Sequence, residues 1–342
     1  MQKKFLAILF ITAFFIGGTF VFGLVGFFTY GNIDQSTTYE YITSGNETEA
    51  INLGADLSDI NLKYNNTPMD DPNISMKADL KIHIEGIFVL GKQFSDFFNP
   101  ITILNDSSIG LDIRRKSLNW FNPMNWFLGM YVNLTITLRT DLKYNITADV
   151  ETGDIILESK SMVTLSQIDL KTNSGDIYLN TFKTNFTQNI YLQTRLGDIY
   201  SYFNNSYLNG NLELKGSAGN LNLNAINFSF QTNSFWNLTT RKGDINLIIK
   251  QNKTMGADVD IYAFITDIGD LNCYYNDTLS SVGTQIRGNV VQGDVILNEP
   301  LNGFEILSEN LIRSEDYISA TYKFDIDLDA VISFINIFAE SS

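Results

Sequence analysis

The sequence predicts an all-β protein, built either as a β-solenoid or as a β-sandwich-like stack of two-strand rungs, and preceded by one transmembrane helix. Three observations lead to this fold class. An uncharged apolar run opens the chain, a short Gly-Asp motif recurs at nearly constant spacing, and apolar residues alternate on both sides of each copy. Apolar residues make up 44% of the 342-residue chain, which is enough for a large core.

Residues 1–30 are predicted to form a short cytoplasmic stub and a membrane anchor. No charged side chain occurs from Phe5 to Tyr30, and a helix needs about 20 apolar residues to cross a bilayer. Lys3 and Lys4 precede the run, so the positive-inside rule places the N-terminus in the cytoplasm. A cleaved signal peptide is the alternative, but its apolar core is usually about 7–15 residues long and ends at a small-residue site that this run lacks. We expect a single-pass cell-membrane protein whose bulk is extracellular.

Residues 31–50 are predicted to be a polar linker, and residues 51–131 an N-terminal β region with an aromatic-rich insert or cap. The repeat pattern breaks between Glu85 and Val132, and the aromatic segment 118–131 lies in this break. The final region, 132–342, is predicted to be the Gly-Asp β-repeat domain with C-terminal closing strands.

The aromatic segment could contact a membrane or a partner protein, because tryptophan favours membrane interfaces. The basic run Arg114 to Lys116 just before it would favour anionic lipid. The alternative is that these side chains are buried as a cap over the open end of the repeats, since terminal repeats need a cover. The residues concerned are Trp120, Phe121, Trp126 and Phe127.

Seven copies of a Gly-Asp or Gly-Asn motif define the repeat domain. Their glycines are spaced by 22, 22, 22, 24, 26 and 24 residues. Glycine tolerates positive φ, and aspartate or asparagine can bond its local backbone, so each pair predicts a tight turn. About 22 residues suit two strands of seven or eight residues and two turns, and stacked copies would bury a continuous core. The repeat-turn residues are Gly153, Asp154, Gly175, Asp176, Gly197, Asp198, Gly219, Asn220, Gly243, Asp244, Gly269, Asp270, Gly293 and Asp294.

These SGDI-type repeats, preceded by the extended segment VNLTITLRTDLKYNITADVETGDIIL, resemble the putative-adhesin repeat family of bacterial and archaeal envelope proteins. The resemblance covers Val132 to Leu297, and GADLSDINLKY from Gly54 reads as a degenerate copy. The resemblance implies a β-repeat fold and an envelope location. It supplies no catalytic residues.

Asparagine is in excess, with 37 residues, and much of the excess falls in N-glycosylation sequons (Asn-x-Ser/Thr). Twelve sequons follow the apolar run, whereas composition predicts about six and the reversed pattern occurs four times. We therefore expect a glycoprotein. The sequon asparagines are Asn46, Asn65, Asn73, Asn105, Asn133, Asn145, Asn185, Asn204, Asn227, Asn237, Asn252 and Asn276.

Five of these sequons recur at a similar position in successive repeats. They lie 10, 7, 8, 9 and 7 residues after the preceding repeat glycine, about one strand away from it. We therefore expect glycans along one edge of the stack and Gly-Asp turns along the other. The five are Asn185, Asn204, Asn227, Asn252 and Asn276.

Stacked rungs would align the repeat aspartates about 4.8 Å apart. Oxygen-rich clusters suit Ca²⁺, so a calcium ladder is one interpretation. The simpler interpretation, which we favour, is that each carboxylate satisfies N–H groups of its own turn and that no cofactor is needed.

Composition argues against catalysis and against nucleic acid. The net charge is −15, and the chain contains one histidine and one cysteine. Phosphate binding needs a basic face, and no nucleophile elbow or phosphate-binding loop is present. His83 and Glu85 are expected as a solvated pair on one strand face, and Cys273 as a buried apolar residue or, alternatively, an intermolecular bridge.

We therefore expect a membrane-anchored, N-glycosylated extracellular β-repeat protein with a non-catalytic surface structural or adhesion and interaction role. Its partners would be the membrane, through the N-terminal helix, and another cell-surface protein or glycan. The alternative is a membrane-proximal sensor or assembly factor that binds lipid or a membrane partner through segment 118–131.

Overall fold

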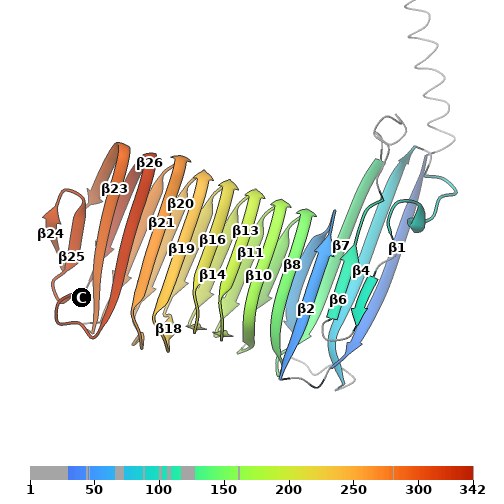
Figure 1. The fold of residues 1–342 in the computed structure, drawn as a ribbon, viewed down its shortest axis with the longest axis horizontal. Coiled ribbons are helices and arrows are strands. Elements are labelled where there is room, and N and C mark those ends of the chain that lie inside the picture. The colour runs from blue at the N-terminus through green and yellow to red at the C-terminus, as the bar shows by residue number, and fades with distance from the viewer. Residues whose placement is uncertain are drawn as a thin grey trace, which may run out of the picture.

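In the computed structural model, the chain forms a parallel β-solenoid in which successive segments stack as rungs (Figure 1). Each repeat supplies one strand before its Gly-Asp corner and one after it. The strands before the corners form one sheet, face 1, and those after the corners form a second sheet, face 2. The structure describes residues 30–43, 45, 47–65, 73–87, 89–99, 102–105, 109–116, 128–160, 162–279 and 281–341.

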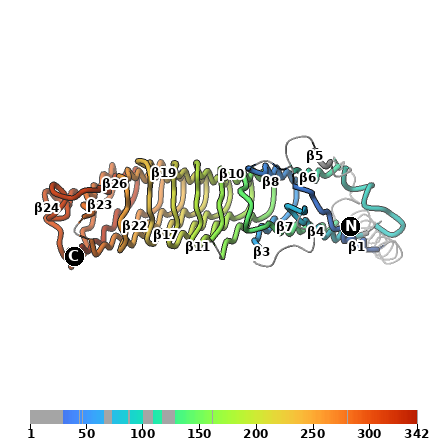
Figure 2. Tube along the Cα trace, turned by 90° about the horizontal axis from the view of Figure 1, so that it is seen from below, coloured from blue at the N-terminus to red at the C-terminus, as the bar shows by residue number. Residues whose placement is uncertain are grey.

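The two faces run beside each other along the length of the molecule (Figure 2). Neighbouring strands within each face are parallel. Face 1 contains, in stacking order, β8 (Lys143–Thr152), β10 (Thr164–Ser174), β13 (Ile190–Leu196), β16 (Leu212–Ala218), β19 (Ser234–Lys242) and β21 (Val259–Ile268). Face 2 contains β9 (Ile155–Ser159), β11 (Ile177–Phe182), β14 (Ile199–Asn204), β17 (Leu221–Ile226), β20 (Ile245–Gln251) and β22 (Leu271–Asp277).

Three of the rungs contain a third, two-residue strand at the edge opposite the Gly-Asp corners. The expectation of two-strand rungs is therefore incomplete. In these rungs seven residues separate the face-2 strand from the next face-1 strand, so the chain has room for a short extra pairing before it turns back. These strands are β12 (Asn185–Phe186), β15 (Tyr207–Leu208) and β18 (Ser229–Phe230).

The core lies between the faces and is built from columns of aliphatic residues. The first inward position of each face-2 strand aligns with the next in register, from Ile155 to Leu271, and every member is 0% exposed. Burying one such side chain contributes about 1.5–3 kcal/mol, which explains why this position is invariably apolar in the repeat.

The first rung precedes the recognisable repeats. It consists of β2 (Thr48–Ala55), which pairs in parallel with β8, and β3 (Asp59–Asn65), which pairs in parallel with β9. Ile60 aligns with Ile155. The prediction that GADLSDINLKY is a degenerate repeat copy is confirmed.

Further strands extend the stack at its N-terminal end: the strands that join the first rung pair with it in parallel, and the outer strands are antiparallel. On face 2, β7 (Leu128–Arg139) pairs with β3, then β4 (Ile74–Ile87) with β7, and β1 (Tyr30–Ile42) with β4. On face 1, β6 (Ile109–Ile113) pairs with β2, and β5 (Thr102–Asn105) with β6. The 3-10 helix η1 (Phe94–Asp96) lies between β4 and β5 in the chain.

The predicted polar linker at residues 31–50 is wrong, because this stretch contains β1 and the start of β2. Every residue of β1 but Tyr41 is exposed or half-buried. An antiparallel strand can keep polar side chains in water while its backbone pairs with a neighbour. The polar composition of this stretch therefore did not distinguish a strand from a linker.

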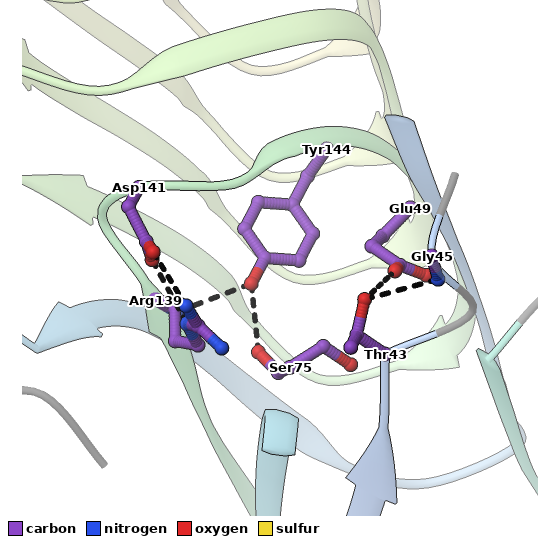
Figure 3. A network of polar contacts seen from close by, with 7 residues as sticks. All are labelled: Thr43, Gly45, Glu49, Ser75, Arg139, Asp141 and Tyr144. Carbon is purple, nitrogen blue, oxygen red and sulfur yellow. Dashed lines mark hydrogen bonds and ion pairs between the residues drawn. The ribbon is translucent and has the colours of Figure 1, made fainter. Parts of the chain in front are cut away.

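A polar network ties the N-terminal strands to the first rungs (Figure 3). The buried Tyr144 hydroxyl donates to the Ser75 carbonyl oxygen at 2.7 Å and accepts from the Arg139 N–H at 3.1 Å. Nearby, Thr43 donates to Glu49 at 2.5 Å. Burial raises the pKa of Tyr144, so its hydroxyl remains a donor.

The C-terminal strands do not follow chain order. β26 (Tyr322–Glu340) pairs with β21 and β22 on one side and with β23 (Val282–Asn298) on the other. The seventh repeat corner, Gly293, is therefore separated from the sixth by β26, contrary to a sequential stack. The hairpin of β24 (Phe304–Ser308) and β25 (Leu311–Ser314) then pairs with β23.

Among the described residues, no helix is long and apolar enough to span a bilayer. The predicted anchor falls outside those residues, apart from Tyr30, the first residue of β1.

Candidate interaction surfaces

The Gly-Asp corners are the tightest points of the solenoid. Gly197 has a φ of 141°, and a Cβ added there would lie 2.1 Å from the carbonyl oxygen of Gly175. Its N–H donates to the carbonyl of Ala218 in the next rung at 3.0 Å. Only glycine combines this backbone conformation with such close packing of neighbouring rungs.

A ladder of side-chain hydrogen bonds connects the corners. Oδ1 of Asp176 accepts the backbone N–H of Asp198 at 2.8 Å, and Oδ1 of Asp198 accepts that of Asn220 at 2.7 Å. We expected each carboxylate to bond its own turn, and this is wrong. Each carboxylate instead bonds the equivalent N–H of the next rung. The ladder runs through Asp59, Asp154, Asp176, Asp198, Asn220, Asp244, Asp270 and the N–H of Phe334.

The ladder uses one oxygen of each corner carboxylate, and at two corners the second oxygen also has a partner within the protein. The second oxygens of Asp176 and Asp198 accept the hydroxyls of Tyr178 and Tyr200, whose rings stack 4.9 Å apart. Burial and the neighbouring carboxylate raise the pKa of Tyr178 to about 12, so its hydroxyl stays protonated. Within the described part of the chain, no three His, Cys, Asp or Glu side chains are grouped as a metal site. Calcium independence remains a prediction.

The edge opposite the Gly-Asp corners contains the five sequons that recur with the repeat, as the rung model predicts. Asn204 and Asn276 lie at the ends of β14 and β22, Asn227 and Asn252 directly follow β17 and β20, and Asn185 begins β12. None of the five is buried.

The other sequons are spread over the faces. Asn133 and Asn145 are half-buried on β7 and β8, and Asn65 ends β3. Asn73 precedes β4 and is exposed. Asn46 and the side chain of Asn105 lie outside the described residues.

Asn237 lies in a shallow groove on the outer side of face 1. The strand registers align Asp169, Tyr191, Glu213 and Asn237 in one row across β10, β13, β16 and β19. All four line the groove, together with Phe235, which is 45% exposed. Oδ1 of Asp169 has no hydrogen-bond partner, whereas its Oδ2 accepts Lys171 at 2.9 Å. The groove offers an aromatic ring beside hydrogen-bonding groups.

The expected His83–Glu85 pair forms, with Nε2 lying 3.6 Å from a Glu85 oxygen. Nδ1 lies 2.7 Å from Asp34 on β1, a second partner that sequence reasoning missed because it lies 49 residues away. These contacts raise the pKa of His83 and lower that of Asp34. The group ties β1 to β4.

Cys273 is buried and free, as expected, and burial raises the pKa of its thiol to about 12. Such a thiol is a poor nucleophile at neutral pH. Its burial also argues against the alternative of an intermolecular bridge.

Two side chains of the basic run before the aromatic segment, those of Arg114 and Lys116, are already engaged within the protein. Arg114 lies 3.0 Å from Asp56 and 2.6 Å from Asp112, and Lys116 donates to a backbone carbonyl. The aromatic residues themselves, Trp120, Phe121, Trp126 and Phe127, lie outside the described residues.

Sequence reasoning also missed an asparagine ladder on face 2. Asn246 donates to Asn222 at 2.9 Å, Asn272 to Asn246 at 3.0 Å, and Asn336 to Asn272 at 2.9 Å. The signal was present, because each of the first three follows its repeat Asp or Asn by two residues. Part of the asparagine excess is therefore structural.

Together, the faces and corners define the class of protein: a repeat-built β-solenoid whose rungs are connected by ladders of side-chain hydrogen bonds. The chain belongs to the Toastrack DUF4097 family, whose model matches residues 70–263, more than half of its length. This supports the adhesin-like repeat resemblance.

A comparison with curated proteins finds no match. Among solved structures, a "putative cell adhesion protein" from Clostridium sporogenes is 12% identical, with a TM-score of 0.28, and the match covers 91% of this chain and 100% of that chain. A "putative adhesin" from Bacteroides fragilis is 15% identical, with a TM-score of 0.34, and the match covers 89% and 97%.

Proposed function

We propose that this chain is a membrane-anchored, N-glycosylated extracellular protein with a non-catalytic structural or adhesion role. The observation that carries the proposal is the distribution of sequons. Ten of the twelve asparagines have described side chains, and none of the ten is buried. Glycan transfer requires such accessible amides, and the ladder-stitched solenoid supplies a stiff support that displays them. The anchor is inferred from the apolar run at residues 5–30.

The test is surface labelling of intact producing cells, followed by mass spectrometry of glycopeptides and crosslinking of neighbours. We expect the chain to be labelled from outside, to carry sugar at several sequons, and to be crosslinked to other surface proteins or glycans. Labelling only after lysis, with unmodified asparagines, would refute the proposal.

A second candidate, a membrane-proximal sensor or assembly factor, is supported by one feature of the fold. Tyr30 pairs with Ile87 of β4, and Gly86 pairs with Leu128 of β7. The described chain therefore resumes after the aromatic segment only two strands, about 10 Å, from the end of the predicted anchor. Flotation of the full chain with anionic liposomes, compared with the anchor-containing W120S/W126S variant, tests whether the segment adds lipid contact. Equal behaviour of the two would refute this candidate.

A further inference from the structure

The groove on face 1 contains the Asn237 sequon at one end of its row of polar side chains. We propose that the chain's own N-glycan, attached at Asn237, lies in this groove with its first sugar against Phe235. The inference rests on the proposed glycosylation, and it adds which site is occupied and where the sugar lies.

The first argument is the direction of the Asn237 amide. The Thr239 hydroxyl donates to Oδ1 of Asn237 at 2.9 Å. Because the amide is planar, fixing Oδ1 toward Thr239 turns Nδ2 toward Phe235, on the other side along β19. Residues two apart on a strand share a face and lie about 6.7 Å apart. The sugar bonded to Nδ2 therefore starts over the Phe235 ring.

In two other sequons the asparagine Nδ2 also points toward the residue two positions earlier, and there it has a hydrogen-bond partner. Nδ2 of Asn133 donates to the Tyr131 hydroxyl at 3.0 Å, and Nδ2 of Asn204 donates to the Tyr202 hydroxyl at 3.1 Å. At Asn237 the aromatic residue has no hydroxyl, so the ring presents only an apolar surface. An exposed apolar ring is stabilised when the CH face of a pyranose covers it.

The second argument is the shape and chemistry of the groove. The row from Asn237 through Glu213 and Tyr191 to Asp169 spans three strand spacings, about 14 Å, which suits several sugar rings in line. The Glu213 carboxylate in the middle of the row can accept sugar hydroxyl donors, whereas the unpartnered Oδ1 of Asp169 is itself buried. The ligand class is thus a neutral oligosaccharide with a stacked first ring.

The experiment uses the full chain purified from a host that N-glycosylates secreted proteins, and it measures the rate at which a peptide-N-glycosidase releases each glycan. The Asn252 glycan is the internal control, because Asn252 is exposed and Lys250, rather than an aromatic, lies two residues before it. We expect release at Asn237 to be about fivefold slower than at Asn252, equivalent to about 1 kcal/mol. Phe235→Ala should remove the difference without changing release at Asn252.

Glu213→Ala, a change beside Asn237 on the neighbouring strand, provides a second variant and should also speed release at Asn237. Equal rates at Asn237 and Asn252 in the unmodified chain would overturn the inference and leave the proposed function standing. So would sugar at Asn252 with none at Asn237. An absence of sugar from every sequon would overturn both.

Discussion

Gly197→Ala tests the corner geometry most directly. A Cβ at this position would lie 2.1 Å from the Gly175 carbonyl oxygen and 2.6 Å from its carbon, and the residue would have to hold a φ of 141°. Backbone strain of this kind costs about 1–3 kcal/mol, and overpacking costs about 1–3 kcal/mol more. We therefore expect the free energy of unfolding to fall by about 2–6 kcal/mol.

The assay is urea unfolding of the full chain, followed by circular dichroism. Gly216→Ala is the matched control, because Gly216 lies within β16 without positive φ and an added Cβ would lie 3.0 Å from the Thr240 side-chain hydroxyl rather than against a backbone carbonyl. This control should change stability by less than about 1 kcal/mol. A Gly197→Ala variant as stable as the Gly216→Ala variant would refute the argument that rung contact at the corner requires glycine.

Four further outcomes follow from the same structure. Asp198→Asn should keep the ladder, as Asn220 does, whereas Asp198→Ala should cost about 1–3 kcal/mol in urea unfolding by leaving a backbone N–H unpaired; equal loss in both would contradict the ladder. Trp236→Ala should cost about 3–5 kcal/mol, because the side chain is fully buried, and an unchanged urea midpoint would count against this. The stabilisation that the His83–Asp34 pair gives to the pairing of β1 with β4 should be complete below the ordinary histidine pKa of about 6.5. It should be lost as pH rises through the raised pKa of His83. Hydrogen exchange of β1 amides at pH 5.5 and 8.5 would show this, and His83→Gln should abolish the difference. EDTA should leave the melting temperature unchanged, and a drop restored by calcium would revive the metal interpretation.

The repeat could be recognised from sequence because its signals are local. A glycine, an aspartate or asparagine and a following apolar residue sit together in each copy, so Gly153 to Gly269 were placed at corners correctly. Even the weak copy that contains Asp59 was recognisable by its alternation.

The C-terminal order could not be predicted, because it depends on pairing between distant strands. β26 turns its corner at Ser333 without a glycine, and only its pairing with β22 and β23 shows that it precedes Gly293 in the stack. The incorrect prediction of a linker at residues 31–50 has a related origin. β1 is held by backbone pairing with β4, and the polar side chains of β1 do not reveal that pairing.

The groove could not be read from sequence either. Asp169 and Asn237 are 68 positions apart and share a row only because each repeat adds a similar number of residues. The interval from Glu213 to Asn237 is two residues longer than the other two, and strand pairing still keeps Asn237 in the row.

The corner ladder has a further consequence for the evolution of length. Each carboxylate reaches only its immediate neighbour, and the three 22-residue intervals from Gly153 to Gly219 are interchangeable in register. Duplication or loss of one 22-residue unit would leave the corner ladder continuous and change the length of the solenoid by about 4.8 Å. The length of such a protein can therefore change during evolution in steps of one rung.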